Sequence, residues 1–183
     1  LKDLMTGMGN TWSSIESYDG DRTRIYMTGT SAGASLCIYL AAMLESLELA
    51  EAFHVIPAEL KIRAMGLVSG MYYTTKPDSI GLFLPSYVYG KQWKKSSFYP
   101  YINPENEAIL RHLPPAFLVT AYGDMLRNYS RQYAEAMKRC GVICHLEDFD
   151  TGKKLPHAFS STFPEMPESK RANERMVKFL LEH

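Results

Sequence analysis

A serine between two small-residue positions stands where an apolar run meets a helix-forming run. R-I-Y-M (residues 24–27) precedes G-T-S-A-G (residues 29–33), and a segment rich in Ala, Leu and Met follows. A G-x-S-x-G pattern between a strand and a helix is typical of a nucleophile elbow, which exposes the serine hydroxyl. Gly29 and Gly33 lie where a Cβ would obstruct the close approach of strand and helix. We therefore expect Ser31 to be a nucleophile.

The G-x-S-x-G pattern by itself is weak evidence for a nucleophilic serine. At average residue usage it occurs by chance in roughly one chain in sixteen of this length, and the alternative is a tight turn whose serine has no chemical role. A helix that begins directly after Ser31 would bring free backbone N–H groups and the positive end of its dipole to the serine oxygen. The backbone N–H of Ala32 is therefore the candidate oxyanion donor.

A serine hydroxyl needs a general base, and that base needs a carboxylate to fix its tautomer. Asp124 follows an apolar run, and the carboxyl ends of strands are where a doubly wound sheet presents catalytic groups. His157 lies in the polar loop after the next expected strand. The chain order Ser, Asp, His is the one that an α/β-hydrolase requires. Asp148 and Asp150 are competing acids.

Each candidate also has a structural alternative. Asp124 would otherwise be a turn or helix-capping residue, and His157 an exposed loop residue. The remaining histidines are interpreted as structural or solvated, because they lie in a strand, near helix ends or at the end of the chain. They are His54, His112, His145 and His183.

The elements that must position these groups alternate along the chain. Strands are expected at 24–27, 62–70, 116–121 and 142–149, and helices at 1–18, 32–53, 128–140 and 168–182. The order strand, helix, strand implies right-handed parallel crossovers, with about four parallel strands visible. The predicted fold class is α/β, a mainly parallel sheet flanked by helices, in a single domain of 183 residues.

Residues 71–115 break this alternation, because they are rich in Pro and aromatic residues and lack a strand pattern. We interpret this stretch as a lid or cap excursion over the top of the sheet, partly helical, with a last short helix at 105–112. Tyr72, Tyr89 and Trp93 are expected to bind substrate by lining an apolar pocket above Ser31. The alternative is that such aromatics only pack the lid onto the sheet.

The composition and charge of the chain argue against several classes of protein function. A formal net charge of +0 gives no electrostatic case for nucleic acid or an anionic membrane surface. No apolar run approaches the roughly 20 residues that span a bilayer. Three cysteines fit a reducing, cytoplasmic compartment better than a disulfide scaffold, and none has metal-ligand company. Cys37 is expected to be a small core residue. We expect no metal and no organic cofactor.

Several segments resemble one family. D-R-T-R-I (21–25) followed by G-T-S-A-G resembles the D-x-x-R-I-x-x-x-G-x-S-A-G segment of the hormone-sensitive-lipase-like branch of the α/β-hydrolases, the GDXG esterases. Residues 114–127 are similar to that family's P-P-x-x-x-x-x-G-x-x-D-x-L-R-D segment, whose Asp is the catalytic acid. H-A-F (157–159) stands where the family usually has H-G-F. The resemblance covers the whole chain and implies hydrolysis of short- to medium-chain carboxylic esters through an acyl-enzyme.

One family feature is absent. An H-G-G-G-type loop upstream of the elbow donates N–H groups to the oxyanion in that family, whereas G-M-G (7–9) lies inside the expected opening helix. Loss of one such donor typically lowers turnover on the order of 100- to 1000-fold. The opening residue Leu1 favours a missing upstream segment over a truncated enzyme.

Two other functions therefore stay open. The chain could be a non-catalytic ligand-binding relative, or a structural fragment that needs a partner segment. If the chain begins at Leu1, an open edge beside the elbow strand favours homodimers or aggregates.

Overall fold

A four-stranded parallel sheet forms the centre of the computed structural model, which describes residues 1–150 and 152–183. Its strands, in spatial order, are β1 (Tyr26–Thr30), β2 (Ala64–Val68), β3 (Ala116–Ala121) and β4 (Cys144–Phe149). Every neighbouring pair is parallel. The central strands β2 and β3 are buried along their whole length, as expected for parallel strands covered on both faces. The predicted α/β class is confirmed.

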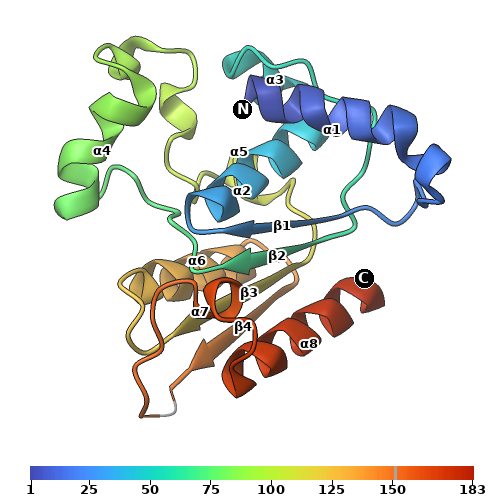
Figure 1. Cartoon of the computed structure of the whole chain (residues 1–183). Coiled ribbons are helices and arrows are strands. Elements are labelled where there is room, and N and C mark those ends of the chain that lie inside the picture. Colours follow the sequence, from blue (N-terminus) through green and yellow to red (C-terminus); the bar gives the residue numbers. More distant parts are fainter. Residues whose placement is uncertain (151) are drawn as a thin grey trace.

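Helices cover both faces of the sheet (Figure 1). One layer holds α1 (Lys2–Ser14), α2 (Ala32–Glu45), α3 (Leu47–Ala52), α5 (Glu107–Leu110) and α6 (Arg127–Arg139), and the other holds α7 (Phe159–Thr162) and α8 (Pro167–Glu182). Successive residues of β3 serve opposite faces, since side chains alternate along a strand. Leu118 belongs to the core under α2 and α6, whereas Phe117 and Val119 belong to the core under α8.

The single helix expected over 32–53 is wrong, because the helix breaks at Ser46. This residue has an extended backbone (φ −135°, ψ 108°), and its hydroxyl accepts a hydrogen bond from the Leu49 N–H at 3.3 Å. Ser46 is therefore the N-cap of a second helix, α3. Good helix formers on both sides hide this break in the sequence pattern.

The excursion between β2 and β3 is partly helical, and its residues form no strand in the described chain. It contains α4 (Ser79–Tyr89), the 3-10 helices Trp93–Lys95 and Tyr99–Tyr101, and α5. The Asp78 carboxylate caps α4 by accepting hydrogen bonds from the N–H groups of Ile80 and Gly81, both at 3.0 Å. In Figure 1, α4 stands on the side of the sheet toward which the strands point.

The sheet has two edges of different character. β1 pairs only with β2 in the described chain, and all its residues are at least partly exposed. An apolar groove of about 440 Å³ lies between α1 and the β1 segment, with Leu4, Met8 and Trp12 among its lining residues. The opposite edge, β4, carries charged side chains that pair with neighbouring helices.

Candidate active site

Ser31 occupies a strained turn between β1 and α2. Its backbone has φ 56° and ψ −119°, a conformation that costs energy in a residue with a Cβ and is typical of functional sites. Hydrogen bonds with β2 and with the segment that follows it hold Ser31 there. The Ser31 N–H donates to the Val68 carbonyl at 2.9 Å, and the Ser31 carbonyl accepts from the Met71 N–H at 3.0 Å. The strand, turn and helix expected of a nucleophile elbow are therefore present.

The two glycines of the elbow differ in how much space a side chain would have at their positions. A Cβ added at Gly29 would lie 2.5 Å from the Gly33 carbonyl oxygen, so close contact of β1 with α2 requires glycine there. A Cβ added at Gly33 would meet no described atom within 4 Å. The expectation that both glycines are needed for close approach is thus wrong for Gly33, which faces open space.

The structure brings Ser31, His157 and Asp124 together. The Ser31 hydroxyl lies 3.0 Å from His157 Nε2 although 126 positions separate the two residues. The other ring nitrogen, Nδ1, lies 2.8 Å from Asp124 Oδ1. With the proton on Nδ1, Nε2 can accept from the serine hydroxyl, which is the tautomer that a general base requires.

The Asp124 carboxylate accepts two hydrogen bonds besides its contact with His157. The side chain of Asp124 is fully buried, whereas that of His157 is 28% exposed. Asp124 Oδ2 accepts a hydrogen bond from the Thr120 hydroxyl at 3.2 Å, and Oδ1 accepts from the Leu126 N–H at 2.9 Å. These contacts come from β3 and from the turn that follows it. The carboxylate is therefore placed by the sheet, and it in turn places the imidazole.

The competing acids have other partners. Asp148 Oδ1 accepts from Arg127 Nε at 2.8 Å, and Asp150 Oδ2 accepts from Arg127 Nη2 at 3.0 Å. The hydrogen bonds that Arg127 donates to Asp148 and Asp150 raise the pKa of its guanidinium. Of the other histidines, His145 stacks on Phe117 with ring centroids 4.7 Å apart. These residues serve β4 and its neighbours rather than Ser31.

Ala32, the candidate oxyanion donor, is the first residue of α2. Its N–H donates no hydrogen bond to another group of the described residues, so it is free to bind a substrate oxygen. Residues 7–9 lie within α1, where their N–H groups belong to a helix. The described chain thus offers Ala32 beside the serine and no G-G-rich loop.

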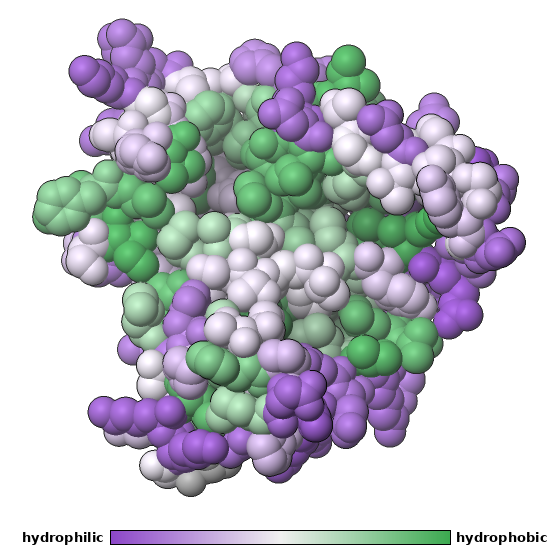
Figure 2. Space-filling model, viewed as in Figure 1, coloured by the Kyte–Doolittle hydropathy of each residue, from purple (hydrophilic) through white to green (hydrophobic). Residues whose placement is uncertain are grey.

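A largely apolar pocket of about 530 Å³ lies beside the elbow, between α2 and the lid. Figure 2 shows hydrophobic surface on both sides of the hollow between α4 and the start of α1. Tyr89 lines this pocket as expected, and its hydroxyl lies 2.9 Å from that of Thr74. The other lining residues near the elbow and under the lid are Ala32, Ser35, Leu36, Tyr39, Phe53, Met71, Val88, Phe98 and Ile102.

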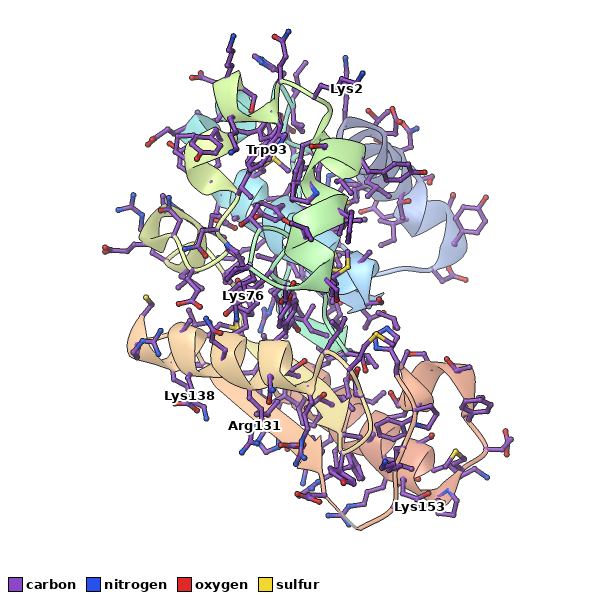
Figure 3. The ribbon with its side chains drawn as sticks, turned by 90° about the vertical axis from the view of Figure 1, so that its left-hand side faces the viewer. Lys2, Lys76, Trp93, Arg131, Lys138 and Lys153 are labelled. Carbon is purple, nitrogen blue, oxygen red and sulfur yellow. The ribbon has the colours of Figure 1, made fainter. Side chains whose placement is uncertain are left out.

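Two of the aromatics expected in the pocket do not line it. Tyr72 is 1% exposed and stacks on Tyr133 of α6, with ring centroids 4.4 Å apart. Its ring fills the space where Gly70 has no Cβ, so it is a core residue. Trp93 is half-buried within the excursion, where its ring centroid lies 6.1 Å from that of Tyr89 and 5.5 Å from that of Tyr99 (Figure 3). The expectation of direct substrate contact is therefore wrong for Tyr72 and is not met by Trp93.

Two pocket residues were not predicted from the sequence, although their spacing from Ser31 could have indicated them. Ser35 and Tyr39 follow Ser31 at spacings of four and eight, so they share one face of the helix that begins at the elbow. The Ser35 hydroxyl donates to the Met71 carbonyl, and the Tyr39 hydroxyl donates to the Ile102 carbonyl at 2.8 Å. Both side chains thus connect α2 to the excursion.

Within residues 1–150 and 152–183, no cluster of three or more His, Cys, Asp or Glu is arranged to hold a metal ion. No helix in the same residues is long and apolar enough to cross a membrane. Cys37 is 5% exposed, as expected for a core residue, and burial raises the pKa of its thiol to about 11.

Solved esterase structures share this fold. Esterase B from Lactobacillus rhamnosis, also solved with a tributyrin phosphonate inhibitor, has a TM-score of 0.88 at 19% identity, over 99% of this chain and 59% of its own. Carboxylesterase Cest-2923 from Lactobacillus plantarum has a TM-score of 0.75 at 15% identity, over 99% and 66%. An esterase of the bacterial hormone-sensitive lipase family has a TM-score of 0.67 at 19% identity, over 93% and 57%.

The sequence comparisons agree with this likeness in fold. No curated protein matches the sequence. A family model described as alpha/beta hydrolase fold matches residues 1–161, which is most of the chain. The chain spans 59% of the length of esterase B. On the family match, this protein belongs to the family of the α/β-hydrolase fold.

Proposed function

We propose that this chain carries the catalytic groups of a serine carboxylic ester hydrolase of the hormone-sensitive-lipase-like branch. The observation that carries the proposal is the pair of hydrogen-bond contacts that links Ser31 through His157 to Asp124. The sequence motifs around these residues resemble that branch. The similar structures are esterases, which supports the proposal by analogy of fold.

The geometry suits a two-step acyl transfer. His157 Nε2 takes the proton of the Ser31 hydroxyl as its oxygen attacks the ester carbonyl carbon. The oxyanion that forms would accept a hydrogen bond from the Ala32 N–H. His157 then gives the proton to the leaving alcohol, and an acyl-serine remains. Water, deprotonated by the same imidazole, releases the acid and restores the serine, while Asp124 keeps the ring oriented.

The pocket beside the elbow supports esters of short or medium acyl chains. It is lined mainly by apolar and aromatic side chains, and its volume of about 530 Å³ suits a small apolar group. Ala32 and Ser35 at its inner wall belong to the first turn of α2, so a bound chain would start close to Ser31. A tributyrin phosphonate inhibits esterase B, and we propose butyrate esters as substrates here.

The test combines turnover with trapping of the serine. The chain is incubated with p-nitrophenyl butyrate and, separately, with a tributyrin phosphonate, and intact mass is recorded. We expect release of nitrophenol and a stoichiometric adduct on Ser31, both abolished in Ser31→Ala. Ser13→Ala, which removes an exposed hydroxyl from α1 whose only hydrogen bond among the described residues is to the Gly9 carbonyl of the same helix, should retain both. Saturable binding of the ester with neither turnover nor adduct would instead favour a non-catalytic ligand-binding relative.

A further inference from the structure

The segment that carries His157 is held in place by groups outside it. Before the histidine, the Leu155 N–H donates to the Tyr122 carbonyl at 2.9 Å. After it, the Ala158 N–H donates to the hydroxyl oxygen of Ser69 at 3.0 Å. The imidazole itself has hydrogen-bond contacts only with Asp124 and Ser31 among the described residues. These two backbone contacts, together with the contacts to Asp124 and Ser31, therefore set where the imidazole lies.

Ser69 is an unusual residue in its own right. It follows β2, the strand between the elbow strand and the strand that leads to Asp124, and it is fully buried. Its backbone has φ 49°, and its N–H donates to the Val119 carbonyl at 2.8 Å. Ala158 also has a positive φ, 58°. Such conformations persist in non-glycine residues only where the surroundings enforce them, and they gather at functional sites.

We propose that Ser69 is a positioning residue for His157, acting in the ester hydrolysis proposed above, on which this inference rests. Its hydroxyl is the side-chain acceptor for the N–H of the residue that directly follows the histidine. Because Ala158 is buried, removal of this acceptor leaves a buried N–H without a partner. The segment would then shift to find another acceptor, and the imidazole would move relative to Ser31 and Asp124.

The competing explanation is that the Ser69 hydroxyl only stabilises the fold. A matched control separates the two explanations. Ser160 lies three residues beyond His157 on α7 and is 1% exposed, but its hydroxyl has no hydrogen-bond partner among the described residues. Ser160→Ala thus removes a buried hydroxyl from the same region without removing a hydrogen bond to the histidine segment.

The first measurement is steady-state hydrolysis of p-nitrophenyl butyrate by Ser69→Ala, Ser69→Cys and Ser160→Ala. A displacement of a catalytic group by 1 Å can cost about 100-fold, so we expect kcat to fall about 10- to 100-fold in Ser69→Ala, with little change in KM. Ser69→Cys, which is nearly isosteric and a weaker acceptor, should fall between Ser69→Ala and the unaltered chain. Ser160→Ala should keep the kcat of the unaltered chain.

The second measurement does not require turnover. The proton on His157 Nδ1, shared with Asp124, should give a downfield proton resonance that disappears in Asp124→Asn. We expect Ser69→Ala to shift or broaden it and Ser160→Ala to leave it unchanged. If the chain hydrolyses no ester, the proposed function fails, while this resonance still tests the role of Ser69. An unchanged resonance and kcat in a folded Ser69→Ala, or in Ser69→Cys should the alanine variant not fold, would overturn the inference.

Discussion

At the scale of single residues, the acid is the member of the site for which the sequence offers the most similar alternatives. Asp124 and Asp150 follow the carboxyl ends of strands, and Asp148 lies near the carboxyl end of β4, so sequence position alone does not separate them. Their partners do, because the side chain of Asp124 is buried against His157 whereas Asp148 and Asp150 bind Arg127. The separation gives each acid a distinct expected phenotype.

We predict that Asp124→Asn lowers kcat for ester hydrolysis about 10,000-fold, because an amide at this position would donate to Nδ1 and favour the wrong histidine tautomer. Asp148→Asn is the matched control, since it removes an equal charge from the neighbouring strand without contacting His157. It should weaken the attachment of α6 and leave kcat nearly unchanged. Equal losses of kcat in the two variants would contradict the assignment of Asp124.

The limits of sequence reasoning are also visible at this scale. Ser31, Asp124 and His157 could be found because their chemistry is rare and each follows a strand. Tyr72 could not be assigned in the same way, because its burial depends on the missing Cβ of Gly70 and on Tyr133 of α6. Tyr133 is distant in the sequence and Gly70 has no side chain. The sequence near an aromatic residue therefore does not indicate on which side of the sheet that residue packs.

At the scale of elements, the start of α4 and the residues just before it are attached to α6. The Asp78 carboxylate, which caps α4, also accepts a hydrogen bond from the Tyr129 hydroxyl on α6. The Lys76 ammonium lies 3.9 Å from the centroid of the Tyr73 ring and donates to Gln132, which places it between the lid and α6 (Figure 3). Farther along α4, Tyr87 is 90% exposed. The start of α4 is therefore anchored to α6, while Tyr87 is exposed to solvent.

This attachment should depend on pH. Hydrogen bonds from the Tyr129 hydroxyl and from the N–H of Gly81 lower the pKa of the Asp78 carboxyl. A lowered pKa in the folded state contributes stability above the ordinary Asp value of about 3.9 and loses it as pH falls through the lowered value. We predict that Asp78→Asn lowers Tm at pH 7 and that the difference from the unaltered chain shrinks below about pH 4.

Circular dichroism melts from pH 7 to pH 3 would check this dependence. Glu174→Gln, which removes an exposed carboxylate from α8, is the control and should leave Tm nearly unchanged at each pH. A Tm difference for Asp78→Asn that persists undiminished at pH 3 would show that the charge of Asp78 is not what holds α4.

The pocket side of α4 carries a separate prediction. Tyr89 lines the pocket while Tyr87, two residues earlier on the same helix, does not. Tyr89→Ala should enlarge the pocket and move ester preference toward longer acyl chains, and Tyr87→Ala should leave preference unchanged. Rates on p-nitrophenyl esters from acetate to octanoate measure this. Unchanged preference together with a lower Tm in Tyr89→Ala would mean that this ring only packs the lid.

Helix and strand positions were predictable where local pattern decides them. The run at 116–121 coincides with β3, and Gly141, with φ 77°, ends α6 as its left-handed conformation requires. The break at Ser46 was not predictable from periodicity, because both flanking segments favour helix. It becomes visible only as a capping serine with an extended backbone. Element order is thus a local property, while the direction of α3 depends on its packing.

At the scale of the whole molecule, the two edges of the sheet differ in how well they are protected against pairing with another chain. β4 reads C-H-L-E-D-F, and its Glu147 pairs with Arg175 at 2.6 Å while Asp148 pairs with Arg127 at 2.8 Å. β1 reads Y-M-T-G-T and carries no charge. Charged side chains on an edge strand discourage pairing with another chain. The β4 edge is therefore protected, and the β1 edge is open in the described chain.

The open edge lies beside an apolar surface. The groove between α1 and the β1 segment, with Met8, Trp12 and Met27 among its lining residues, is continuous with the strand whose outer hydrogen-bonding groups face away from β2. Figure 2 shows hydrophobic surface below α1 at this place. A second copy of the chain could therefore gain both backbone hydrogen bonds and apolar burial by pairing here.

We predict that the 183-residue chain associates as its concentration rises, through β1. Thr28→Lys places a charge at the exposed centre of this strand and should lower the weight-average mass measured by light scattering. His145→Lys, an exposed position on β4, is the matched control and should leave association unchanged because that edge is already charged. Equal effects of the two substitutions would assign association to net charge rather than to β1. A chain that stays monomeric at every concentration would mean that α1 and the groove residues already shield the edge.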